Sequence, residues 1–258
     1  MSRTTNSADS AAMTVIDRSS RALRLPTIRT RASEVIAAAT REQWSHAQFL
    51  AEILASECDD RDLRARARRV AAAGFPRAKT LAEFDTDANP HVEPALLGTL
   101  ATAAWVQAGK PLCLIGDSGT GKSHLLIALG TAAAEAGHRV RYVLASRLVN
   151  ELAEAENERQ LTRLINRYGR VDLLCIDELG YLQLDRRGAE LLFQVMTERE
   201  ERAALAVASN EPFSNWGNTF TDPRLCSAII DRITFNGTII ETGTTSYRLT
   251  STRANRSH

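Results

Sequence analysis

The stretch LCLIGDSGTGKSHLLIALG, residues 112–130, decides the fold. It sets a glycine-rich loop between two apolar runs and fits the phosphate-binding pattern G-x-x-x-x-G-K-[ST] from Gly116 to Ser123. The first run, PLCLI (111–115), predicts a short buried strand, and SHLLIALGTAAAEAG (123–137) predicts a helix that ends at a glycine. A strand, a phosphate loop and a helix in this order indicate a nucleotide-binding α/β domain rather than an ordinary glycine-rich turn.

Each residue type in the loop suits a bound triphosphate. Glycines let the backbone come close to a ligand, and the loop N–H groups and the helix N-terminus attract phosphate oxygens. Lys122 would contact the β- and γ-phosphates of ATP, and the Ser123 hydroxyl would ligate Mg²⁺. The loop residues predicted to bind nucleotide are Gly116, Asp117, Ser118, Gly119, Thr120, Gly121, Lys122 and Ser123.

Hydrolysis needs a metal partner and a residue that positions water, and LLCIDELG (173–180) supplies both types. Asp177 ends a predicted buried strand and would hold Mg²⁺ through water, and Glu178 would polarise the attacking water. Asn210 follows another strand and could hydrogen-bond the water and the γ-phosphate. An acidic pair can also cap a helix, and asparagine is common in turns. Ligand sites in parallel sheets lie at the carboxyl ends of the strands, which favours the catalytic interpretation.

From about residue 92 onward, helical and β-rich runs alternate, which predicts a parallel sheet covered by helices on both faces. The expected strands are 111–115, 139–145, 171–177, 204–209 and 237–242, and further helices are expected at 92–107, 146–169, 186–200 and 222–233. The expected organisation is a disordered tail (1–21), a helical N-terminal domain (22–74), a linker (75–94), an ATPase domain (95–250) and a C-terminal tail (251–258). Ser45 and Gln48 have the spacing of a capping box at a helix start.

Charge is distributed unevenly along the chain. Residues 1–80 carry 14 basic and 9 acidic side chains, although the net charge of the whole chain is only +1. The arginine clusters at 18–31 and 61–69 fit solvated helix faces and contacts with a nucleic-acid backbone equally well. The sequence has no apolar run of membrane-spanning length and no secretory signal. The four cysteines are far apart, as expected for free thiols in the cytoplasm rather than a zinc site.

Five motifs in order make the chain resemble the AAA+ ATPases of the IstB-like group, transposition helper proteins that are similar to DnaC-type helicase loaders. The motifs are GDSGTGKS, LLCIDELGYL, VASNEPFSNW, IIDRI and SYRL. The resemblance implies a five-stranded parallel sheet in which the strand of Asn210 lies between those of Lys122 and Asp177. It implies that Arg232 is an arginine finger for a neighbouring subunit and that Arg248 contacts the nucleotide. It also implies that the region 146–169 is a helical insertion that contacts DNA.

The resemblance further implies ATP-dependent homo-oligomers on DNA that assist a transposase. A loader of the replicative helicase is the alternative within the same fold. A small-molecule kinase and an adaptor that never hydrolyses ATP are the alternatives of other classes, and Glu178 argues against the adaptor. Arg224 is a rival to Arg232 as the finger. Two positions depart from the family pattern: Thr245 stands where many relatives have an acidic residue, and Glu211 stands where a basic or neutral residue is commoner.

Overall fold

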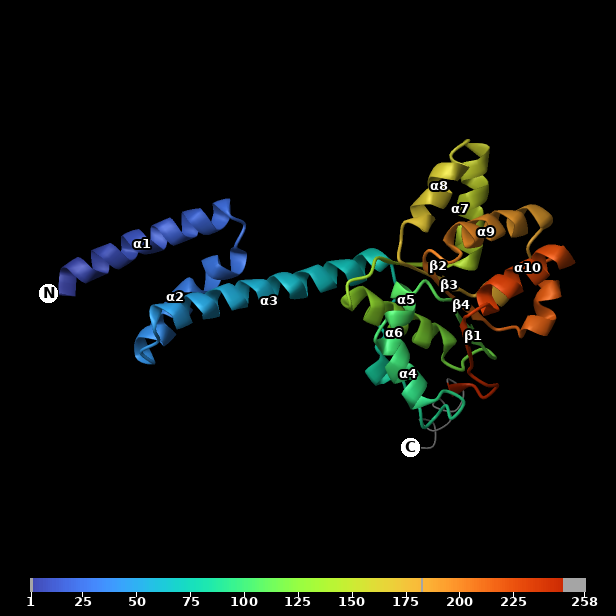
Figure 1. Cartoon of the computed structure of the whole chain (residues 1–258), viewed down its shortest axis with the longest axis horizontal. Coiled ribbons are helices and arrows are strands. Elements are labelled where there is room, and N and C mark those ends of the chain that lie inside the picture. Colours follow the sequence, from blue (N-terminus) through green and yellow to red (C-terminus); the bar gives the residue numbers. More distant parts are fainter. Residues whose placement is uncertain (1, 182, 248–258) are drawn as a thin grey trace, which may run out of the picture. The chain divides into compact units, whose positions relative to one another are not determined.

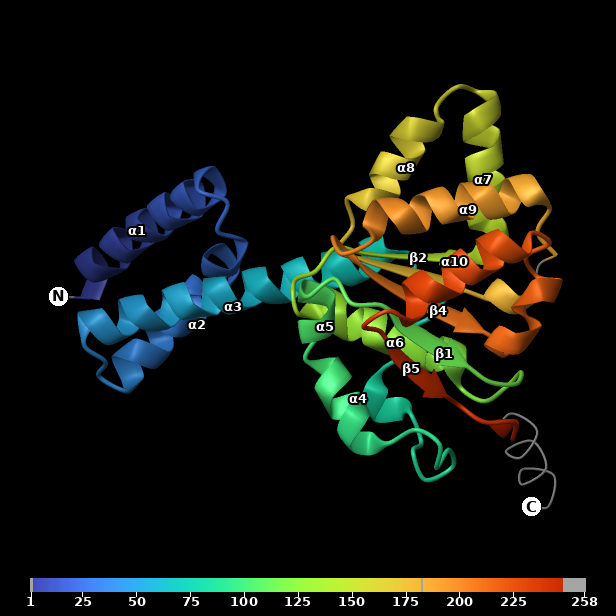
Figure 2. The same ribbon diagram turned by 45° about the vertical axis from the view of Figure 1, so that its right-hand side comes forward.

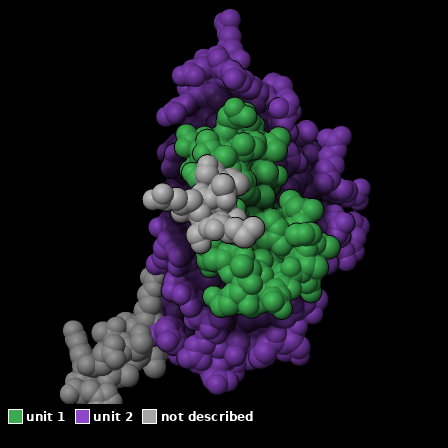
Figure 3. Space-filling model, turned by 90° about the vertical axis from the view of Figure 1, so that its left-hand side faces the viewer, with its two compact units in different colours: residues 1–67 green, residues 68–258 purple. Residues whose placement is uncertain are grey.

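The computed structural model describes residues 2–181 and 183–247 (Figure 1). The chain divides into two compact units, residues 1–67 and 68–258, which Figure 3 shows in separate colours. The division falls inside helix α3 (His46–Ala73) rather than at the expected boundary after residue 74. The physical reason is that the last turns of α3 pack into the second unit. Ala73 is fully buried in its core, and the Arg69 guanidinium donates to the Ala134 carbonyl at 2.8 Å.

The first unit consists of α1 (Ser2–Ala22), α2 (Pro26–Arg41) and most of α3. The sequence predicts a disordered tail at 1–21, whereas the structure has a helix there. Met13 and Ile16 of this helix pack against a small apolar core, which gives the segment a reason to fold. That core is made of Ala32, Val35 and Ile53.

Glu57 organises the polar side of this unit. Its carboxylate is nearly buried and accepts from the backbone N–H groups of Thr27 and Ile28, at 2.8 and 3.0 Å, which caps the start of α2. Arg64 pairs with Glu57 at 3.4 Å and also donates to the Thr27 hydroxyl. Arg64, although its side chain is 44% exposed, is therefore already engaged in contacts within the first unit.

The second unit contains a parallel five-stranded sheet with the strand order β2-β3-β4-β1-β5 (Figure 2). The strands are β1 (Leu112–Ile115), β2 (Val140–Leu144), β3 (Leu173–Asp177), β4 (Ala204–Ser209) and β5 (Thr238–Glu241). All five expected strands are present, each within two residues of its expected ends. The strand that precedes Asn210 lies between those of the phosphate loop and Asp177, as the resemblance implies.

Helices cover both faces of the sheet (Figure 2). One face packs against α4 (Pro94–Ala101), α5 (Ala104–Gln107) and α6 (Lys122–Glu135). The other packs against α7 (Ala145–Asn157), α8 (Leu161–Gly169), α9 (Arg186–Arg199) and α10 (Pro223–Thr234). Short 3₁₀ turns lie at Leu81–Glu83, Leu179–Tyr181 and Phe213–Asn218.

Two expected helices are each split into a pair. The expected helix at 92–107 forms α4 and α5, which are separated by Ala103 with a φ of 57°. The expected helix at 146–169 forms α7 and α8, which are separated by Arg159 with a φ of 59°. A left-handed residue ends an α-helix, and neither residue is a glycine that would have signalled the break. The Ser45–Gln48 capping box is confirmed by both of its hydrogen bonds, at 2.8 and 3.2 Å.

Cys113, Cys175 and Cys226 are free and buried, and Cys58 is free and exposed. Burial raises the pKa of the Cys113 thiol to about 12, so it behaves as an apolar side chain. Across residues 2–181 and 183–247, no helix combines the length and the apolar character needed to cross a membrane.

Candidate nucleotide site

The phosphate loop joins β1 to α6 at the edge of the sheet where the strands end. Its backbone is tied to the end of β4 and to the segment that follows β5. Gly116 N–H donates to the Ser209 carbonyl and Asp117 N–H donates to the Gly243 carbonyl, at 3.3 and 3.0 Å. The side chain of Lys122 folds back across the loop and donates to the Asp117 carbonyl at 2.7 Å. The ammonium is therefore held over the concave side of the loop, where phosphate oxygens would lie.

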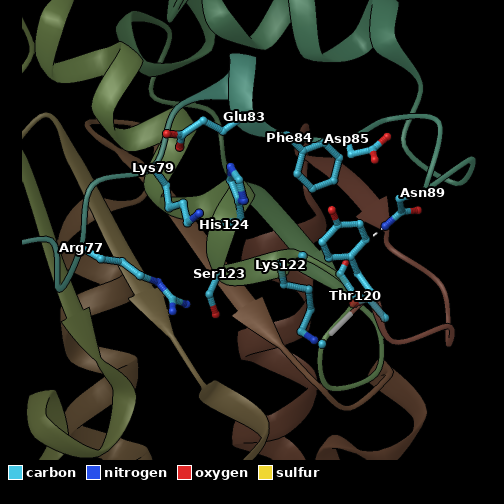
Figure 4. A pocket seen from close by; sticks show the side chains of 13 residues that line it. Arg77, Lys79, Glu83, Phe84, Asp85, Asn89, Thr120, Lys122, Ser123 and His124 are labelled. Atoms are coloured by element: carbon cyan, nitrogen blue, oxygen red, sulfur yellow. Dashed lines mark hydrogen bonds between the residues drawn. The ribbon is translucent and has the colours of Figure 1, made fainter. Parts of the chain in front are cut away.

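The segment 75–94, which the sequence analysis treats only as a linker, forms a wall of the nucleotide cavity. Phe84 lies against Gly121, where an added Cβ would come within 2.7 Å of the ring, and Gly121 has a φ of 100°. Asn89 is buried and donates to the carbonyls of Thr120 and Thr242, at 2.8 and 3.1 Å. The linker is thus fixed to the loop itself (Figure 4).

The cavity between this wall and the loop is lined by three cationic side chains and by the carboxylates of Glu83 and Asp85. Arg77 and Lys79 come from the linker, and Lys122 and Ser123 come from the start of α6 (Figure 4). The cations suit an anionic ligand such as a triphosphate. The sequence alone does not predict Arg77, Lys79, Phe84 or Asn89 as site residues, because nothing in it indicates that the linker folds back over the loop.

Ser123 and Asp177 meet where α6 begins and β3 ends. The Ser123 hydroxyl donates to Asp177 Oδ1 at 3.1 Å, and Asp177 is only 3% exposed. These are hard oxygen donors of the kind that Mg²⁺ prefers, and such a cation usually completes its shell with water and phosphate oxygens. The pair therefore fits a magnesium ion bound together with a nucleotide, and a cage made only of protein side chains is not required. The described residues contain no group of three or more His, Cys, Asp or Glu side chains placed to hold a metal.

Tyr142 is a further neighbour of Asp177 that the sequence analysis did not identify. It lies on β2, and its hydroxyl donates to Asp177 Oδ2 at 2.8 Å. Burial first, and then the Asp177 carboxylate, raise the pKa of Tyr142 well above its usual value, so the hydroxyl stays protonated and can donate. In the β2–β3 register Tyr142 lies opposite Cys175, two residues before Asp177, so the side chains of Tyr142 and Asp177 lie on the same face of the sheet. The contact follows from strand pairing, which no pattern in the sequence specifies.

Glu178 and Asn210 lie at the same edge of the sheet. Glu178 has a φ of 60°, an uncommon conformation for a residue with a side chain, and its N–H donates to Asp177 Oδ1 at 2.9 Å. Asn210 directly follows β4, and its Oδ1 is buried without a hydrogen-bond partner in the described part of the chain. Gly180 makes room for this amide, because an added Cβ would lie 2.4 Å from Asn210 Oδ1. The site thus combines an uncommon backbone conformation with an unsatisfied amide oxygen.

The candidate finger residues lie at opposite edges of the sheet. Arg232 lines a cavity with residues that precede β1 and β4, at the edge where strands begin, so it is remote from its own phosphate loop. Its Nε donates to Glu200 at 2.9 Å, and its guanidinium lies 4.3 Å from the centre of the Phe193 ring. Arg224 is exposed at the start of α10, at the edge where the strands end. Arg248 lies outside the described residues.

A second basic feature lies away from the nucleotide cavity, on α8 and the segments that flank it. A cavity there is lined by five arginines, namely Arg139, Arg159, Arg163, Arg167 and Arg170. Arg139 pairs with Asp172, and Arg167 pairs with Glu151. Arg163 and Arg170 are exposed and make no ion pair with another described residue. They lie within and just after the segment expected to be a helical insertion used against DNA.

Comparison with known proteins agrees with this geometry. An insertion sequence ATP-binding protein of Sinorhizobium fredii (strain NBRC 101917 / NGR234) is 37% identical over 237 residues, which cover 92% of this chain and 80% of that protein. The IS21 ATP-binding protein of Pseudomonas aeruginosa is 35% identical over 83% of this chain and 81% of its own length. Among solved structures, the replication initiator DnaA bound to AMPPCP and single-stranded DNA has a TM-score of 0.52 and 23% identity, over 65% of this chain and 50% of that one.

The structural likeness and the strand order confirm the expected AAA+ P-loop fold, a parallel sheet with helices on both faces. The helices α1 to α3 precede this fold, as expected. Residues 19–255 match the family described as IstB-like ATP binding protein, so the match extends over the helical N-terminal region as well as the ATPase fold. The chain therefore belongs to the family of IstB-like ATP binding proteins.

Proposed function

We propose that this protein is a Mg²⁺-dependent ATPase that assembles on DNA with ATP and assists a transposase. The observation that carries the proposal is the pairing of Ser123 with Asp177 at 3.1 Å beside Glu178. It joins the phosphate loop to a carboxylate and a candidate base at one edge of the sheet, and hydrolysis needs all of these parts.

Each residue has a role that its position supports. Lys122 would neutralise charge on the β- and γ-phosphates, and Ser123 and Asp177 would hold the cation. Bound Mg²⁺ would supply charge neutralisation of the phosphates. Glu178 would accept a hydrogen bond from the attacking water and take its proton, and Asn210 would orient that water. The other proposed contacts, from the backbone of Gly116 to Gly121 and from Arg248, serve binding.

The arginines on and around α8 support the DNA part of the proposal. Arg163 and Arg170 are exposed cations without carboxylate partners among residues 2–181 and 183–247, as suits contact with phosphate oxygens. In the first unit Arg64 is held by Glu57 and Thr27, whereas Arg18, Arg24, Arg29 and Arg66 are exposed and pair with no carboxylate among the described residues. We assign DNA contact first to the surface of α8, because it lies in the segment where the resemblance implies a DNA-contacting insertion, and the first unit is the second candidate surface.

The transposase is favoured over a replicative helicase by the relatives. Both of the reported relatives are named as ATP-binding proteins of insertion sequences. A helicase loader shares the fold, and fold likeness alone does not identify a partner. A kinase would transfer phosphate to an acceptor other than water, so release of free phosphate distinguishes it from the proposed ATPase.

The test compares two charge-matched double variants. Arg163→Ala with Arg170→Ala should leave nucleotide binding intact but weaken duplex DNA binding. It should also reduce the magnitude of the slope of log affinity against log salt concentration by about one to two. The control is Arg186→Ala with Arg202→Ala, which removes two exposed arginines, one at the start of α9 and one in the turn between α9 and β4. DNA affinity is measured across a salt series, and phosphate release is measured with and without DNA. Equal DNA binding by the two double variants, or the absence of phosphate release by the wild type, would contradict the proposal.

A further inference from the structure

The two oxygens of the Asp177 carboxylate accept hydrogen bonds from different partners. Oδ1 accepts from the Ser123 hydroxyl and from Glu178 N–H, at 3.1 and 2.9 Å. Oδ2 accepts from the Tyr142 hydroxyl at 2.8 Å. The two oxygens therefore differ: one faces the phosphate loop and the other faces the neighbouring strand.

Tyr142 is itself held firmly. It is 8% exposed, and its ring meets the Phe75 ring edge to face, with centroids 6.0 Å apart and an interplanar angle of 60°. Phe75 in turn fits against α6 at Gly130, where an added Cβ would lie 2.8 Å from the ring. A buried, packed ring keeps its hydroxyl in one place, so the hydrogen bond to Asp177 restrains the carboxylate more than a flexible or exposed donor would.

We propose that Tyr142 is a positioning residue of the metal site, whose hydroxyl fixes the Asp177 carboxylate with Oδ1 directed at Ser123 and the cation. The inference rests on the proposed Mg²⁺–ATP function. Within the described part of the chain, the Tyr142 hydroxyl bonds to Asp177 and forms no hydrogen bond with Ser123 or the phosphate loop, so it would act through Asp177 alone. Partners that orient a metal ligand typically change metal affinity or activity by about 10- to 100-fold when they are removed.

The chain offers a matched control. Tyr168 is also buried, at 1% exposure, and its hydroxyl donates to a carboxylate, Glu151, at 2.7 Å. This pair lies on α7 and α8, away from the nucleotide cavity. Tyr142→Phe and Tyr168→Phe therefore remove the same group from the same kind of hydrogen bond, and only the first removes it from the proposed metal ligand.

The experiment titrates Mg²⁺ against the full-length protein with a fluorescent ATP analogue and without DNA. Tyr142→Phe should raise the Mg²⁺ concentration for half-maximal binding about 10-fold or more, while nucleotide binding in EDTA stays at the wild-type level. Tyr168→Phe should leave both quantities unchanged. Mn²⁺ in place of Mg²⁺, followed by electron paramagnetic resonance, gives a direct measure of metal affinity that does not depend on turnover.

A double-mutant cycle with Asp177→Asn tests whether the tyrosine acts through the carboxylate. The effect of Tyr142→Phe on Mg²⁺ dependence should disappear in the Asp177→Asn background. An unchanged Mg²⁺ dependence in Tyr142→Phe, or an equal effect in both backgrounds, would overturn the inference and leave the ATPase proposal standing. A wild-type protein whose nucleotide binding ignores Mg²⁺ would instead overturn the metal site of the proposed function, and the inference with it.

Discussion

At the scale of single residues, Glu178 carries the strongest chemical prediction. Glu178→Gln should keep Mg²⁺–ATP binding but slow hydrolysis about 10²- to 10⁴-fold, because the amide has nearly the same shape but cannot take a proton from water. Binding is measured by nucleotide titration and turnover by phosphate release. Glu201→Gln is the control, since Glu201 has a similar φ of 58° and lies at the opposite edge of the sheet. Turnover at the wild-type rate in Glu178→Gln would show that another group positions the water.

The sequence predicts some residues of this site better than others. Lys122, Ser123 and Asp177 could be predicted because fixed spacing and a strand end determine where they lie. Tyr142 could not be identified by spacing alone, since its contact with Asp177 depends on which strands pair and in what register. The unsatisfied oxygen of Asn210 depends on the close approach of Gly180, which is a tertiary contact.

At the scale of elements, apolar periodicity predicted the strands well because each is short and rich in apolar residues, and β1, β3 and β4 are buried along their whole length. It failed where a helix is interrupted without a change in pattern. Ala103 and Arg159 adopt left-handed conformations although both residue types are good helix formers. The role of the linker at 75–94 in the nucleotide cavity was the largest feature that the sequence did not predict. Its polar composition resembles that of a free connection, and its contacts with the phosphate loop are all long-range in sequence.

Asn89 tests the structural role of this linker. Asn89→Ala should lower the free energy of unfolding by about 1–3 kcal/mol, because the carbonyls of Thr120 and Thr242 would lose their buried donor. It should also weaken ATP binding, since Thr120 belongs to the loop that cradles the phosphates. Denaturant unfolding and nucleotide titration measure the two effects. Asn218→Ala, at an exposed position in the 3₁₀ turn after β4, should change neither. A loss of stability with unchanged ATP affinity would show that the linker supports the fold without shaping the site.

At the scale of the whole molecule, the position of Arg232 limits how it could act. It lies at the edge where the strands begin, while Lys122, Asp177 and Glu178 lie at the edge where they end. An arginine so placed could reach a γ-phosphate only in a neighbouring subunit. Its contacts with Glu200 and Phe193 hold the guanidinium in one orientation, and its side chain is still 23% exposed. A guanidinium stays charged and can contact two phosphate oxygens at once, which suits this role.

Mixing two inactive variants tests action between subunits. Arg232→Ala should bind ATP almost normally but hydrolyse it poorly. Glu178→Gln should be inactive because its amide cannot take a proton from the attacking water. In a head-to-tail assembly formed from equal amounts of both, about one quarter of the interfaces would pair an intact Arg232 with an intact Glu178, so activity should recover to about that fraction of wild type. The measurement is phosphate release from the mixture, with co-assembly checked by a tag on one variant. If the variants bind ATP and co-assemble but the mixture stays inactive, Arg232 does not act between subunits. Arg224, exposed at the edge that carries the phosphate loop, would then be the arginine to replace.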